Sequence, residues 1–183
     1  MLLERADIAE ACIEQFEQAD NMTERLSALS CLVNSVFQKD AATALAAFEQ
    51  EFAHEPLVMD QWFSVQASSP VYGTLECVQS LMQHAGFTIK NPNRVRTVIG
   101  AFSQHNLPVF HAQDGSGYRF LAEQVAKLDE LNPQISARLV SPLTRWRSYA
   151  EPHALLMREA LITLRNRDSL SKDLFEVLEK SLA

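Results

Sequence analysis

Residues 91–102 read NPNRVRTVIGAF, and this stretch decides the fold class. Asn91 suits the position that caps a helix N-terminus, and Pro92 suits the first helical position, where its missing N–H costs nothing. Apolar side chains then recur at helical spacing, at Val95, Val98, Ile99 and Phe102. The pattern predicts a helix with one buried face.

Similar start signals recur along the chain. Asn132-Pro133 repeats the Asn-Pro device, and either Asp20 or Asn21 can cap a helix that begins at Met22. Two further start signals are Asp40, as the cap of the next helix, and Pro56, in the first turn of the helix after that. Gly86 is a helix stop signal. Only five glycines occur in 183 residues, and no convincing strand alternation appears, so the chain is predicted to be all-α.

The rhythm of these segments predicts an architecture. About ten short helices are expected, and paired helices recur at roughly 30 to 40 residues, which is typical of a helical solenoid of stacked hairpins, an armadillo- or HEAT-like superhelix. An irregular helical bundle is the alternative. Because no linker rich in proline, glycine or serine interrupts the chain, residues 1–183 are expected to form a single domain.

Composition limits the partners and the compartment. The net charge of −7 argues against binding to nucleic acid or to an anionic membrane surface. No stretch approaches the roughly 20 apolar residues that a membrane-spanning helix needs. The three cysteines, Cys12, Cys31 and Cys77, form no Cys-x-x-Cys pair, and we expect them to be buried free thiols in a reducing, cytoplasmic compartment.

The sequence contains no recognisable metal site. A helical zinc-protease site needs H-E-x-x-H, which places two imidazoles one turn apart with a carboxylate base between them. His54-Glu55 is not followed by a second histidine, and no two of the five histidines lie four residues apart. We therefore expect no metal ligands and no cofactor in this chain.

The main predicted loop, residues 110–117, also lacks a catalytic set. Ser116 lies in Gly115-Ser116-Gly117, which is neither a G-x-S-x-G nucleophile elbow nor a phosphate loop. The loop is expected to be a tight turn with Asp114 or Ser116 as helix cap; an anion site at the helix start is the alternative. A small enzyme that uses His111, Asp114 and Ser116 lacks support, because their spacing matches no base–nucleophile arrangement.

Three arginines and a glutamine are more informative. Arg94 and Arg96 are two helix positions apart, so they project about 200° apart and flank the apolar face on opposite sides. Gln134 and Arg138 are four residues apart and share one helix face. Pro142 should kink the helix and aim Arg138 into a cavity. The alternative is a solvated helix edge with ordinary ion pairs.

Five segments in the same order resemble the C-terminal helical domain of the aminopeptidase N (alanyl aminopeptidase) family of gluzincin zinc metallopeptidases. The segments are 19–26, 57–63, 91–96 with 99–102, 110–112 with 114–118, and 132–134 with 137–139. The ending Ser181-Leu182-Ala183 also looks like the natural C-terminus of that family. The resemblance runs over nearly the whole chain.

The resemblance implies that this chain alone is not a peptidase. In the family, an H-E-x-x-H site and a third carboxylate hold one zinc ion in a separate thermolysin-like domain, which is missing here. The parent protein is expected to release N-terminal residues from short peptides. The expected partners of this chain are the catalytic and other domains of the same polypeptide.

The resemblance also implies a role for this domain. In the family it closes over the catalytic domain, restricts access to the active-site chamber and contributes side chains to the chamber wall. Arg96, Gln134 and Arg138 match the positions of those wall residues and are expected to bind the carboxylate end or backbone carbonyls of a short peptide.

A stand-alone helical-repeat module that binds peptides or proteins is the alternative. It should have polar capping helices at both ends. The N-terminal segment instead carries Leu2, Leu3, Ile8 and Ile13, which indicates a continuation upstream.

Overall fold

The computed structural model describes residues 5–183, and they are almost entirely helical. The helices are α1 (Ala6–Gln18), α2 (Met22–Val33), α3 (Gln38–Phe52), α4 (Pro56–Ser68), α5 (Leu75–Leu81), α6 (Pro92–Val95), a π-helical turn η1 (Arg96–Gly100), α7 (Ala101–His105), α8 (Leu107–Phe110), α9 (Ser116–Asp129), α10 (Pro133–Leu139), α11 (Ser141–Thr144), a 3-10 turn η2 (Trp146–Ser148), α12 (His153–Arg165) and α13 (Lys172–Leu182). No β-strand forms in this range, so the all-α prediction is confirmed.

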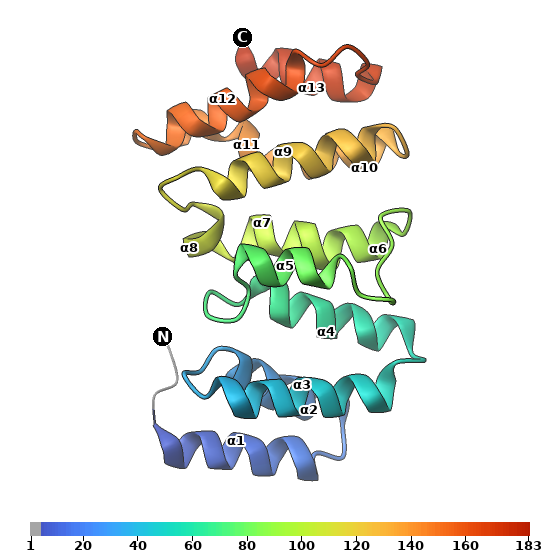
Figure 1. Cartoon of the computed structure of the whole chain (residues 1–183), viewed down its shortest axis with the longest axis vertical. Helices are drawn as coiled ribbons and strands as arrows, with labels where there is room; N and C mark the ends of the chain where they lie inside the picture. Colours follow the sequence, from blue (N-terminus) through green and yellow to red (C-terminus); the bar gives the residue numbers. More distant parts are fainter. Residues whose placement is uncertain (1–4) are drawn as a thin grey trace.

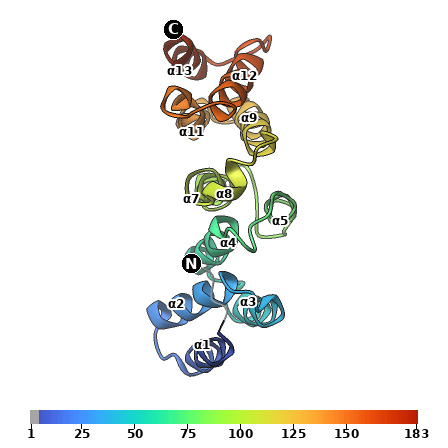
Figure 2. The same ribbon diagram turned by 90° about the vertical axis from the view of Figure 1, so that its left-hand side faces the viewer.

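The helices stack in chain order along the long axis of the molecule, from α1 at one end to α12 and α13 at the other (Figure 1). Seen from the side, α2, α7, α11 and α13 lie on one side of the stack, and α3, α5, α9 and α12 lie on the other (Figure 2). Each hairpin packs against its neighbours in sequence. The predicted solenoid is therefore confirmed, and the irregular bundle is excluded.

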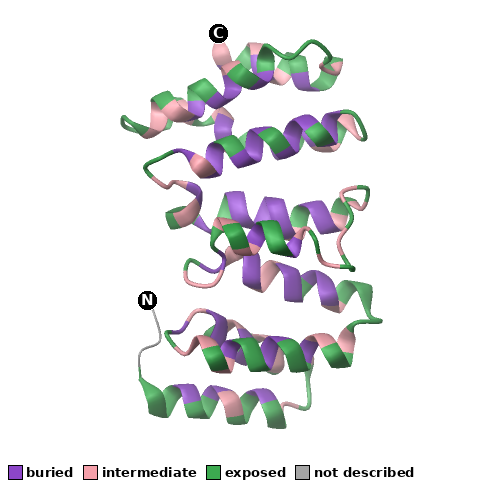
Figure 3. Cartoon of the chain, in the orientation of Figure 1, coloured by how far each residue is buried: buried purple, intermediate pink, exposed green. Residues whose placement is uncertain are grey.

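One continuous cluster of buried side chains runs through the stack, from Cys12 in α1 to Leu178 in α13. Figure 3 shows buried positions on every level, on the helix faces that meet a neighbouring helix. Toward the N-terminus, Ile8 is 39% exposed and Ile13 is partly buried. Leu2 and Leu3, on which the expected upstream continuation also rested, lie outside the described residues.

Asparagine caps form where the sequence predicts them. The Oδ1 atom of Asn21 accepts a hydrogen bond from the Glu24 N–H at 3.0 Å, so Asn21 rather than Asp20 caps α2. Asn91 and Asn132 accept from N–H groups two and three residues onward, at 2.9 and 3.2 Å. These bonds join near neighbours in the chain, which is why local sequence predicts them.

Two of the helix ends predicted in the first half of the chain are wrong. Asp40 does not cap α3, which begins at Gln38, because Ser35 closes the preceding turn by accepting the Phe37 N–H at 3.0 Å. Asp40 lies inside the first turn instead, where its charge favours the positive end of the helix dipole. Gly86 does not stop α5, which ends at Leu81; within residues 5–183, Gly115 is the one glycine with positive φ.

Candidate functional site

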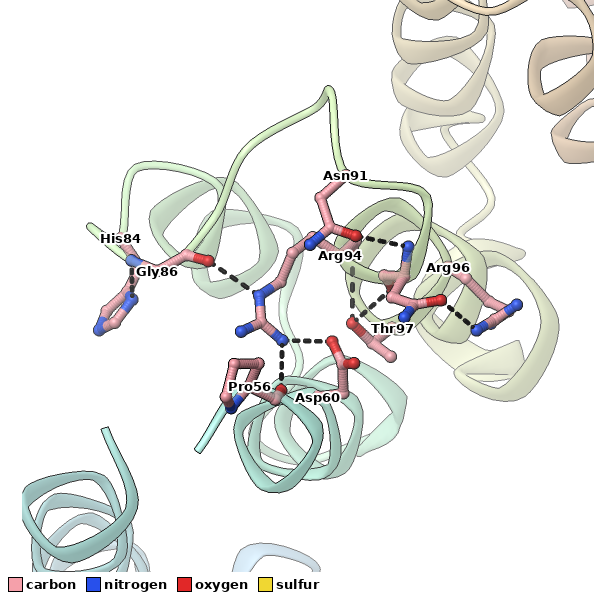
Figure 4. Close-up of polar contacts among 9 residues, drawn as sticks. Pro56, Asp60, His84, Gly86, Asn91, Arg94, Arg96 and Thr97 are labelled. Atoms are coloured by element: carbon pink, nitrogen blue, oxygen red, sulfur yellow. Dashed lines mark hydrogen bonds and ion pairs between the residues drawn. The ribbon is translucent and has the colours of Figure 1, made fainter. Parts of the chain in front are cut away.

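Arg94 is a structural residue and not part of a binding site. Its side chain is buried, and Figure 4 shows it reaching from α6 toward α4. The guanidinium donates to the Gly86 carbonyl at 2.8 Å, to the Pro56 carbonyl at 3.1 Å and to the carboxylate of Asp60. It also lies 5.0 Å from the ring centroid of Phe63. These contacts tie α6 to α4.

Arg96 projects away from Arg94 and is exposed (Figure 4). Its Nη2 atom donates to Oδ1 of Asn93 at 2.6 Å, and its stem lies beside Gly100, where an added Cβ would be 3.7 Å from Arg96 Cγ. Among residues 5–183, no carboxylate lies within ion-pair distance of Arg96. Its positive charge is therefore available to a ligand. Arg94 and Arg96 point in different directions, as their spacing predicted.

The helix that carries Arg96 is not regular. The stretch Arg96–Gly100 forms a π-turn, in which the Ala101 N–H donates to the Arg96 carbonyl five residues back. Single π-turns inside α-helices are often found at functional sites. The apolar spacing at Val95, Val98 and Ile99 does not reveal this irregularity, because all three side chains stay buried.

Gln134 and Arg138 share the exposed face of α10. The opposite face is held against α9 by buried Ser136, whose hydroxyl donates to the Val125 carbonyl at 3.0 Å. That bond fixes which side of α10 faces outward. The interruption expected at Pro142 is present, since α10 ends at Leu139 and α11 begins at Ser141.

The three predicted contact residues come from consecutive levels of the solenoid. Arg96 lies in the helix that continues into α7, and Gln134 and Arg138 lie in the helix that continues into α11. Figure 2 places α7 and α11 on the same side of the stack. No hydrogen bond joins the three side chains within the described chain. They form a set of exposed donors on a chain whose net charge is −7.

His111, Asp114 and Ser116 do not form a catalytic set. Asp114 accepts the Ser116 N–H at 3.0 Å, and this hydrogen bond lowers the pKa of the Asp114 carboxyl. His111 instead bonds the hydroxyl of Tyr118 through Nδ1 at 2.6 Å, and His153 bonds the same hydroxyl at 3.0 Å. Asp114 therefore supports the predicted tight turn, but neither Asp114 nor Ser116 caps the helix, because Gly115 is the N-cap of α9 and makes no side-chain cap bond. His111 belongs to a different cluster.

The His111–Tyr118–His153 cluster was missed by the sequence analysis. Tyr118 is fully buried, and burial raises its pKa to about 12. Burial lowers the pKa of His111, and the nearby His153 lowers it further. His153 is 35 residues from Tyr118, and no local spacing signals that the two meet.

Other chemistry is limited in the described part of the chain. Residues 5–183 contain no group of three or more histidine, cysteine, aspartate or glutamate side chains placed to hold a metal ion. None of the helices in this range is both long and apolar enough to cross a membrane. Cys12 is buried and Cys77 is partly buried, and burial raises the Cys77 pKa to about 11. The expectation of a buried thiol is wrong for Cys31, which is exposed on α2.

Comparison with known proteins gives the family. Residues 1–183 match the family described as a domain of unknown function (DUF3458_C) with ARM repeats. The chain belongs to the DUF3458_C family. This match and the stacked hairpins agree on an armadillo-like solenoid.

The DUF3458_C chain is also similar to parts of larger aminopeptidases. It is 45% identical to aminopeptidase N of Haemophilus influenzae over 170 residues and 44% identical to aminopeptidase N of Escherichia coli over 171 residues. These matches cover 92% and 93% of the chain but only 19% of each relative. The resemblance to bacterial aminopeptidase N is confirmed.

A solved structure shows the same arrangement of helices. The crystal structure of Legionella pneumophila aminopeptidase A in complex with aspartic acid matches the DUF3458_C chain with a TM-score of 0.89 at 32% identity. The match covers 96% of this chain and 21% of that one. The solenoid therefore recurs as about a fifth of a larger aminopeptidase chain.

Proposed function

We propose that this chain is the non-catalytic C-terminal domain of a zinc-dependent aminopeptidase that releases N-terminal residues from short peptides. The observation that carries the proposal is the coverage: the match takes in 92% of this chain and only 19% of the aminopeptidase N relative. In this proposal, zinc is held by the catalytic domain of the parent protein, where it activates water and polarises the scissile carbonyl. The parent is assigned to the cytoplasm, which agrees with three free cysteines.

The solenoid has two roles in the proposal. It closes over the catalytic domain and limits access to the chamber, and it supplies contacts to the bound peptide. Arg96 and Arg138 are exposed cations with no acidic partner among residues 5–183, and Gln134 adds an amide on the same face as Arg138. Guanidinium groups form short, charge-assisted hydrogen bonds to carboxylates, so these side chains favour short peptides whose terminal carboxylate lies within reach.

The first experiment compares this chain with its parent. We expect the 183-residue chain to show no hydrolysis of an alanyl chromogenic substrate with added zinc, because its described residues hold no metal ligands. The full gene product should hydrolyse the substrate and lose activity with a chelator. Zinc-dependent activity in the 183-residue chain would contradict the proposal. A gene product that consists of these residues alone would favour the stand-alone binding module.

The second experiment tests the contact residues in the full-length parent. We expect Arg138→Ala to lower kcat/KM for an alanyl dipeptide roughly tenfold, the effect of losing one charge-assisted hydrogen bond. A chromogenic alanyl amide, which has no carboxylate, should be hydrolysed at nearly the original rate. Steady-state kinetics on both substrates measure the difference.

Lys127→Ala is the matched control for Arg138→Ala. Lys127 is also an exposed cation, but it lies on α9, on the other side of the stack (Figure 2). Its removal should change neither substrate. Unchanged dipeptide kinetics in Arg138→Ala, or equal losses in the two variants, would remove Arg138 from the peptide site.

A further inference from the structure

A recess lies on the side of the stack that carries α7 and α11. It is a pocket of about 190 Å³ between α7–α8 and the α11–η2 segment. Its walls include the apolar side chains of Leu107, Phe110 and Pro142, with the ring of Tyr149. The apolar walls suit the organic part of a small ligand.

The pocket has basic side chains beside its neutral polar groups. His105, His111 and Arg145 line it, and no aspartate or glutamate is found among its described lining residues. Within residues 5–183, Arg145 has no carboxylate at ion-pair distance and makes no side-chain hydrogen bond. In an acidic chain, a recess whose described lining contains an unpaired arginine and no acidic side chain is suited to an anion.

His111 lines this pocket and has one ring nitrogen without a hydrogen-bond partner among the described residues. Its Nδ1 atom is taken by the Tyr118 hydroxyl at 2.6 Å, so Nε2 is the ring nitrogen left for a ligand. The tilted ring of Tyr149 lies against the imidazole with the centroids 4.7 Å apart and holds it in place. The imidazole is therefore fixed from two sides, by a hydrogen bond and by an aromatic contact.

The Tyr118 hydroxyl also controls the proton on Nε2. It has one proton and lies between the Nδ1 atoms of His111 and His153, so it donates to one of them and accepts from the other. When Tyr118 donates to His111, the neutral His111 ring carries its proton on Nε2. When Tyr118 donates to His153, His111 donates to Tyr118 through Nδ1, and Nε2 carries a proton only if the ring is protonated. Nε2 is therefore an N–H donor when Tyr118 donates to His111 or when His111 is protonated, and a bound anion favours these two forms.

The position of the pocket connects it with the predicted peptide contacts. Ser103 follows Arg96 by seven residues and Arg145 follows Arg138 by seven, so the pocket lies further along the same pair of helical segments. A peptide longer than a dipeptide, whose backbone carbonyls contact Arg96 and Arg138, extends its terminal carboxylate beyond them toward Arg145.

We propose that this pocket binds the C-terminal carboxylate of a short peptide, with Arg145 and His111 Nε2 as donors. The choice of a peptide rests on the proposed function, whereas the preference for an anion rests on the pocket alone. Because no acidic side chain in the described lining could hold an ammonium group, an N-blocked carboxylate binds better than a free amino acid.

The test follows the histidine ring signals of this chain by NMR. N-acetylalanine is added, in parallel with N-acetylalaninamide, alanine and inorganic phosphate. Saturable shifts of the His111 signal are expected with N-acetylalanine, weaker ones with alanine, and none with the amide. His54, which is exposed and does not line the pocket, should not respond.

The pKa of His111 supplies a second readout. In the free chain it lies below its ordinary value because of burial and His153. The groups that face the ring are Tyr118, Tyr149 and His153, with His105 and Arg145 across the pocket. A bound carboxylate stabilises the imidazolium, so N-acetylalanine should raise the His111 pKa and should bind more tightly as the pH falls through that pKa.

Arg145→Gln should weaken N-acetylalanine binding about tenfold or more, while Lys127→Gln, which removes the same charge on α9, should leave it unchanged. Both residues are exposed, so neither variant threatens folding. Equal binding of N-acetylalanine and its amide, equal losses in the two variants, or a response to phosphate alone would overturn the proposal. The binding measurement needs no peptidase activity. A negative binding result would therefore contradict the pocket proposal without contradicting the proposed function.

Discussion

Gly117→Ala is expected to lower the free energy of unfolding by about 3 kcal/mol, at the upper end of the range for overpacking. Gly117 lies in the first turn of α9, where the chain passes directly over α8. A Cβ at this position would be 2.3 Å from the Phe110 carbonyl oxygen and 2.8 Å from the Phe110 Cα. Both atoms belong to the backbone, so relief requires that α8 and α9 separate.

The clash reverses the effect that helix propensity alone would give. Alanine is about 1 kcal/mol more favourable than glycine inside a helix, so a local argument predicts that Gly117→Ala is stabilising. Urea denaturation followed by circular dichroism at 222 nm decides between the two signs.

Gly100→Ala is the matched control. Gly100 is also buried in a helical segment, but the nearest neighbour of an added Cβ is Arg96 Cγ at 3.7 Å, an ordinary contact. We expect a change in unfolding free energy within about 1 kcal/mol of zero. A loss as large as that of Gly117→Ala would show that helix backbone geometry, and not the approach of Phe110, explains both results.

Arg94→Met is expected to cost about 3 to 5 kcal/mol, the usual effect of removing one partner from a buried ion pair. Arg94 and Asp60 are 7% and 8% exposed, so Asp60 would be left as a buried carboxylate without its counter-charge. The Gly86 and Pro56 carbonyls would lose their donor as well. Urea denaturation measures the loss as a lower midpoint.

Two further variants separate charge burial from packing. The double variant Arg94→Met with Asp60→Leu removes both charges and should recover a substantial part of the lost stability, because no unpaired charge remains. Arg165→Met breaks the Arg165–Glu179 pair, in which both side chains are 44% exposed, and should cost no more than about 1 kcal/mol. If Arg94→Met lowered the free energy of unfolding no more than Arg165→Met, the Arg94 contacts between α4 and α6 would not stabilise the solenoid.

The sequence predicted the polar features that depend on near neighbours. Asn21, Asn91 and Asn132 cap the helices that follow them, because each bond spans two or three residues. The shared face of Gln134 and Arg138 follows from helix geometry alone. The Asp40 prediction failed because a competing local bond, from the Phe37 N–H to Ser35, started the helix earlier.

The candidate site could be predicted only in part. Arg94 and Arg96 both flank the apolar face, and their separation by two residues predicts that their side chains leave the helix in different directions. Which of them is buried depends on Asp60, 34 residues away on another hairpin. The role of Arg96, Gln134 and Arg138 as peptide contacts stays a prediction, because only a bound peptide and the parent enzyme can test it.

By itself, the sequence determined that this protein is a chain of capped, amphipathic helices in a repeating rhythm, because capping and helical periodicity act over at most a few residues. Tertiary structure alone decided which polar groups meet between hairpins. Asn106 donates to the Ala67, Ser69 and Gly73 carbonyls, and Tyr118 meets His153, across 33 to 39 residues of chain. Such contacts depend on how the helices stack, and the stacking is set by the continuous apolar core and not by the spacing of the polar residues themselves.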